Sequence, residues 1–127
     1  MSTRRTRLSL ILAAFLVVTA VATTGAAASG RATPTRATKT VKGIVTHWMP
    51  ATVRISPGGE IRWKAVSGTH TVTAYGGNWT FNHSLPTGQV EDRHFAHAGT
   101  FRFRCTIHST LTNGQCSGMC GKVVVRN

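Results

Sequence analysis

Acidic residues are almost absent from this chain. Its 127 residues include 3 Asp and Glu against 15 Lys and Arg, giving a formal net charge of +12. Three carboxylates offer few candidates for catalysis by a carboxylate pair, and the sequence shows no pairing of a nucleophile with a base. We therefore do not expect an enzyme. The positive charge favours an acidic protein partner or the anionic cell envelope. Because the basic residues are scattered instead of clustered, we do not expect nucleic acid to bind.

Long apolar runs are missing as well. The run Leu8 to Val21 has fourteen residues, fewer than the ~20 that a membrane-spanning helix needs. It follows a basic start and precedes small residues, which is typical of a secretory signal. We therefore expect residues 1–28 to be a signal peptide and the protein to be exported to the periplasm, the cell envelope or the medium. The pair Arg4 and Arg5 leaves both general secretion and twin-arginine export open.

No stretch of useful length has the period of a helix. Residues 29–40 are polar and have no hydrophobic period, so we expect a flexible linker there. From Val41 onward, short β-rich runs are separated by Gly and Pro turns, with a longer connection expected from Trp79 to Val90. Residues 41–127 are thus predicted to form one all-β domain, a Greek-key β-sandwich of about seven to eight strands, which we expect to be a monomer.

Cysteine is scarce, and one of the three cysteines lies in a suggestive place. Cys105 ends a run that alternates like a β-strand, with two phenylalanines on the same face as the sulfur. His108 follows where the chain must leave that strand, and Met119 comes later in the same stretch. A thiolate, an imidazole and a thioether form a soft ligand set that suits copper. His70, which follows a probable loop and opens another strand, supplies the second imidazole.

These residues resemble the cupredoxins, the small blue copper proteins such as plastocyanin. The resemblance implies that His70, Cys105 and His108 are equatorial ligands of one type 1 copper ion and that Met119 is the weak axial ligand. It extends over roughly Trp48 to Val125 and rests on short motifs: Met49-Pro50, Pro57 to Trp63, His70 to Val72, Gly99 to Phe101, Cys105 to His108, and Gly118-Met119.

The segment between the second histidine and the methionine departs from the family pattern. Ten residues separate His108 from Met119, and we interpret Ser109 to Cys116 as an insertion that could shift the axial sulfur. Cys116 and Cys120 are expected to form a disulfide, as befits an exported protein. Two alternatives stay open. First, the Cys-x3-Cys spacing is similar to the binuclear copper loop of cytochrome oxidase subunit II. Second, the two cysteines together with Cys105 and His108 have a spacing that would suit structural zinc.

Other residues receive more modest interpretations. Trp63 and Phe95 are expected in the core because large aromatics on strands first of all bury area. Ala65 stands where we expected a family asparagine that ties the two ligand loops, which leaves that support in doubt. Four histidines outside the motifs are expected to be solvated, although the last two could form a weak surface copper site: His47, His83, His94 and His97.

Together these observations predict an exported copper protein that carries one electron to and from a redox partner with an acidic docking surface. The rival prediction is an envelope protein that binds or delivers copper without changing its redox state. A third, weaker possibility is a copper enzyme whose site is opened by the inserted segment.

Overall fold

The computed structural model describes residues 36–127, all of it strands, turns and loops. The expected signal peptide and most of the expected linker lie outside the described residues. Among those described, no helix is long and apolar enough to cross a membrane. The strands are β1 (Thr38–Ile44), β2 (His47–Met49), β3 (Thr52–Ile55), β4 (Gly59–Ser67), β5 (His70–Tyr75), β6 (Asn82–Leu85), β7 (Val90–Phe95), β8 (Gly99–Thr112) and β9 (Gln115–Val125).

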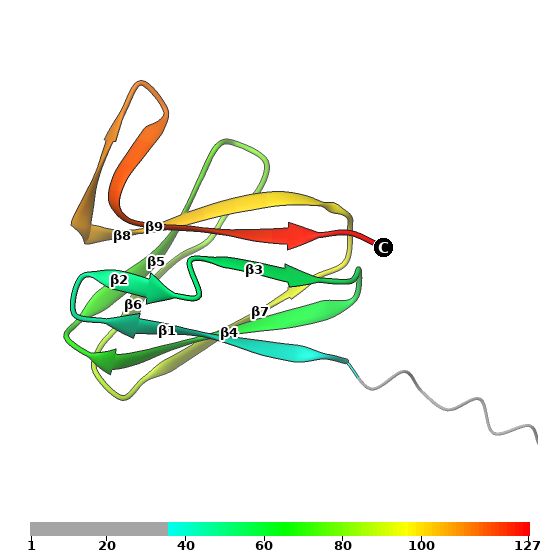
Figure 1. The fold of residues 1–127 in the computed structure, drawn as a ribbon, viewed down its shortest axis with the longest axis horizontal. Helices are drawn as coiled ribbons and strands as arrows, with labels where there is room; N and C mark the ends of the chain where they lie inside the picture. The colour runs from blue at the N-terminus through cyan, green and yellow to red at the C-terminus, as the bar shows by residue number, and fades with distance from the viewer. Residues whose placement is uncertain (1–35) are drawn as a thin grey trace, which may run out of the picture. The chain divides into compact units, whose positions relative to one another are not determined.

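These strands form two sheets that pack as a sandwich (Figure 1). One sheet has the order β2-β1-β4-β7, and the other has the order β3-β9-β8-β5-β6. Neighbours are antiparallel except for β1 beside β4 and β3 beside β9, which run parallel. The predicted all-β sandwich is confirmed, with nine strands instead of seven or eight.

The strand count differs because short or polar segments also pair. The expected connection between Trp79 and Val90 contains β6, which pairs with β5 along its length. Strand β6 lies at the edge of its sheet, and Leu85 is its single buried residue. Its sequence is therefore almost wholly polar and lacks the hydrophobic alternation that would have predicted a strand. Similarly, β1 begins at Thr38, inside the expected linker, because Thr38 is already in register with Glu60 of β4.

The core lies between the sheets and is rich in aromatic rings. Trp63 is fully buried at its centre, 5.3 Å from the ring of Phe103 and 5.6 Å from that of Phe81, measured between centroids. Phe95 is also buried, 6.5 Å from Trp63. Both residues predicted for the core are therefore confirmed there, and the rigid packing extends to the end of the sandwich that carries Cys105.

Candidate metal centre

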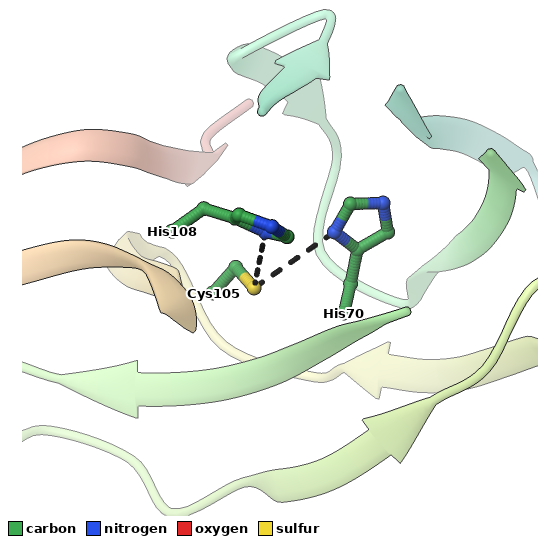
Figure 2. A group of neighbouring side chains, drawn as sticks. All are labelled: His70, Cys105 and His108. Carbon is green, nitrogen blue, oxygen red and sulfur yellow. Dashed lines mark hydrogen bonds between the residues drawn. The ribbon is translucent and has the colours of Figure 1, made fainter. Parts of the chain in front are cut away.

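Three side chains meet at one end of the sandwich. The ligand atoms of His70, Cys105 and His108 all lie within 4.8 Å of one another, and no other such group of three occurs in residues 36–127. Figure 2 shows both imidazoles turned toward the sulfur from two sides, His70 at 3.8 Å and His108 at 3.4 Å, each through Nδ1. The geometry thus brings together the three residues that the sequence singled out.

His70 is fixed from behind. It opens β5 directly after a loop whose Gly68 has φ +83°, a left-handed conformation that glycine adopts without strain. Its Nε2–H donates to the carbonyl oxygen of Ser67 at 2.9 Å. Because a carbonyl only accepts, the proton is on Nε2, and the lone pair of Nδ1 is free on the side that faces Cys105. The imidazole is fully buried, and the hydrogen bond through Nε2 fixes its orientation.

Cys105 lies where β8 interrupts its pairing with β9. The ladder between them is regular up to Arg104 and resumes at Ser109, so Cys105 and His108 fall in the interruption. The Cys105 side chain is fully buried, and its sulfur accepts the backbone N–H of Thr71 at 3.4 Å. This N–H fixes the position of the sulfur, and a metal would be bound by the thiolate form of the side chain.

His108 is the half-exposed member of the three. The irregular segment of β8 that carries it is braced by Ser109, whose hydroxyl donates to the carbonyl of Cys105. Arg104 in turn donates to the carbonyl and hydroxyl of Ser109. On the other side, a Cβ at Gly118 would lie 2.4 Å from the carbonyl oxygen of His108. The β8–β9 hairpin therefore holds His108 by direct backbone contact that only glycine permits.

Met119 is 1% exposed and lies in β9 opposite the interruption in β8. The indole N–H of Trp48 donates to its carbonyl oxygen at 3.2 Å, and the Trp48 ring packs 5.6 Å from that of His70. Its burial opposite the interruption is compatible with a fourth ligand, and its role as axial ligand stays a prediction.

The other two cysteines are joined to each other. Cys116 and Cys120 form a disulfide with Cα atoms 6.1 Å apart, and Met119 lies inside the ring that it closes. Cys105 is the free cysteine of the described residues. Neither the binuclear copper alternative nor the zinc alternative has its cysteine ligands available in this structure. The segment interpreted as an insertion is the outer part of the β8–β9 hairpin, which projects from the sandwich (Figure 1).

Hydrogen bonds between two threonines link the two ligand loops, which the residue pattern around Ala65 did not predict. Thr71, next to His70, accepts the backbone N–H of Thr106 with its hydroxyl at 2.9 Å, and the two hydroxyls lie 3.0 Å apart. A threonine directly after a ligand in each of two neighbouring strands was the available signal. The two ligand loops are therefore tied without an asparagine.

The remaining histidines do not join the site. His83 pairs with Glu91 at 2.9 Å. All four are exposed, as expected for solvated residues: His47, His83, His94 and His97.

Comparison with solved structures places this geometry in a known architecture. An oxidised variant of amicyanin superposes with a TM-score of 0.58 at 21% sequence identity, over 68% of this chain and 80% of that one. A purple cupredoxin from Nitrosopumilus maritimus gives 0.54 at 19% identity, over 68% and 98%. The chain has the cupredoxin fold. A reduced amicyanin variant gives 0.59 at 20% identity, over 70% and 82%. No family model matches the sequence, and neither does any protein of curated function.

Proposed function

We propose that the protein is an exported electron carrier that holds one copper ion of type 1 at His70, Cys105 and His108, with Met119 as the axial ligand. The observation that carries this proposal is the convergence of two Nδ1 atoms and one sulfur at 3.4 Å and 3.8 Å. Two imidazoles and a thiolate in a trigonal set, with a thioether further away, form the donor set of blue copper sites.

The chemistry of the donors fits copper better than zinc. Structural zinc takes four strong ligands in a tetrahedron, whereas this site offers three such donors and a thioether. Bound copper would take up and release one electron, and the buried sulfur and His70 would keep their positions in both states because backbone groups hold them. The fixed donors therefore favour a carrier over a catalyst.

His108 gives this site its contact with solvent. It is the half-exposed ligand, and Ile107 and Leu111 beside it in the chain are 57% and 41% exposed. We propose that a redox partner docks at this end of the monomer, with apolar contacts at the centre and acidic groups that meet the surrounding positive charge. The similarity in fold to amicyanin supports this assignment.

Copper(II) added to the purified metal-free protein tests the proposal. An intense visible thiolate band with reversible voltammetry is expected, and Cys105→Ser should abolish the band. His108→Gln should change it strongly, whereas His83→Gln, which removes a histidine outside the site, should leave it unchanged. A colourless copper complex would overturn the assignment. Copper(I) bound much more tightly than copper(II), with no reversible wave, would favour the storage or delivery role instead.

A further inference from the structure

A second feature lies at the end of the sandwich away from the metal centre. Strand ends and a turn enclose a cavity of about 780 Å³ that is bordered by four basic side chains and no acidic one. We call these four residues the basic cradle: Arg36, Lys39, Arg54 and Arg126. The remaining lining residues are Ala37, Ile55, the turn Ser56 to Gly59, the exposed His94, and Asn127.

The charges of the cradle are not compensated within the described residues. The carboxylate of Asp92 is bound to Arg62 at 2.8 Å, and that of Glu91 to His83 at 2.9 Å. Glu60 accepts a hydrogen bond from the hydroxyl of Thr38. None of the three carboxylates forms a salt bridge with a cradle residue, so the four cations have no charged side-chain partner among the described residues.

The backbone that carries the cradle is held in place. Arg126 donates its N–H to the carbonyl of Ile55, and Glu60 donates to that of Ala37. The turn between β3 and β4 is tied to β7, because Gly58 donates to Phe95 at 2.8 Å. The cations therefore project from fixed strand ends, so little backbone order has to be gained when an anion binds.

The cradle and the metal centre lie toward opposite ends of β1 and β9. In β1, Lys39 borders the cradle, whereas Gly43 touches His70. In β9, Met119 lies in the core near the site, and Arg126 follows the end of the strand at the cradle. At about 3.3 Å per residue, Lys39 lies about 13 Å from Gly43 along β1, and Arg126 lies about 23 Å from Met119 along β9. An anion in the cradle would leave His108 facing away from it.

We propose that the basic cradle binds the phosphate groups of anionic phospholipids and docks the protein on a membrane surface. A protein interface needs an apolar or aromatic centre, yet none of the exposed large apolar side chains of the described residues borders this cavity. Arginine forks suit phosphate. The proposal does not depend on copper.

Vesicle binding of the purified protein, its N-terminus fixed by mass spectrometry, tests the proposal. The vesicles contain phosphatidylglycerol and phosphatidylcholine at low salt, with phosphatidylcholine alone as the neutral comparison. Two variants lose the same charge. The cradle variant carries Arg36→Gln, Lys39→Gln, Arg54→Gln and Arg126→Gln, and the control carries Lys42→Gln, Lys64→Gln, Arg102→Gln and Lys122→Gln.

Each basic residue near an anionic surface contributes roughly a fivefold gain in binding, from about 1 kcal/mol apiece. The cradle variant should therefore bind at least about a hundredfold more weakly, the control less than about tenfold more weakly, and salt should abolish the difference. Equal losses in both variants would overturn the proposal, as would equal binding to neutral vesicles. Binding to soluble polyphosphate or to an acidic protein without binding to vesicles would also overturn it. Circular dichroism serves as the control that both variants are folded.

Discussion

The substitution Gly43→Ala tests whether the orientation of His70 sets the properties of the metal centre. A Cβ at residue 43 would lie 2.7 Å from Cδ2 of His70 and 3.0 Å from Cζ3 of Trp48. Both distances are shorter than ordinary contacts between carbon atoms. Gly43 is not among the residues with positive φ, so alanine adds volume without backbone strain. The new methyl group must therefore push one of the two rings.

Neither ring can yield freely. His70 is held through Nε2 by the Ser67 carbonyl, and Trp48 is held through its indole N–H by the Met119 carbonyl. Metal ligands must lie within about 0.2 Å of their ideal distances, whereas the clash requires a shift of several tenths of an ångström. Disturbing the groups that orient a ligand lowers metal affinity by about 10–100-fold. We expect a loss of copper affinity in this range, with a shifted thiolate band.

Competitive titration with a copper chelator measures that loss, and absorption and paramagnetic resonance spectra report the site. Gly59→Ala is the matched control, because its Cβ would lie 3.0 Å from the carbonyl oxygen of Ser56 and 3.1 Å from Cβ of Ile55, at the far end of the sandwich. Overpacking should destabilise both variants by about 1–3 kcal/mol. Copper affinity and spectrum that are the same in the two variants would refute the reasoning.

Two other contacts give simpler predictions. Replacing both Cys116 and Cys120 with serine removes the link around Met119, and the free energy of unfolding in urea should fall by about 2 kcal/mol from loop entropy; unchanged stability, or three alkylatable thiols in the untreated protein, would contradict the disulfide. The hydrogen bond from Arg62 lowers the pKa of Asp92, with a further electrostatic contribution from the same guanidinium, while burial acts in the opposite direction. The pair therefore stabilises the fold above the pKa of an unfolded aspartate, about 3.9, and this stabilisation is lost as the pH falls through the lower pKa of the folded state. Asp92→Asn should flatten the acid side of the plot of melting temperature against pH; an identical slope in both proteins would argue against the pair.

The sequence could predict the parts of this structure that depend on local periodicity. Alternation places the sulfur of Cys105 and the ring of Phe103 on the same inward face, and both are fully buried. Spacing places His108 three residues after Cys105, within reach of that sulfur, although β8 continues to Thr112 after the interruption instead of ending there. The three residues that converge were therefore accessible from residue type, spacing and strand period, as was the sandwich itself.

Other features depend on which strands become neighbours, and no local pattern encodes that choice. Three strands, β2, β3 and β4, separate Gly43 from His70 in the chain. The parallel pairing of β1 with β4 nevertheless places Gly43 against the imidazole. In the sequence, Trp48 is one apolar residue among others. The hydrogen bond from its indole N–H to the carbonyl of Met119 depends on the three-dimensional arrangement and could not be predicted. For Cys116 and Cys120, the same spacing serves a disulfide or a metal loop, so the sequence favoured the disulfide without excluding the metal-binding alternatives.

The register of β8 and β9 explains how a long hairpin coexists with an ordered site. Arg104 pairs with Cys120 and Ser109 pairs with Gly118, so residues 105–108 on one strand face Met119 alone on the other. The expectation was that added residues could displace the axial sulfur. In the structure the added residues pair with each other from Ser109 to Thr112 and from Gln115 to Gly118. They lengthen the ladder beyond the site, so Met119 is fixed by pairs on both sides of the interruption.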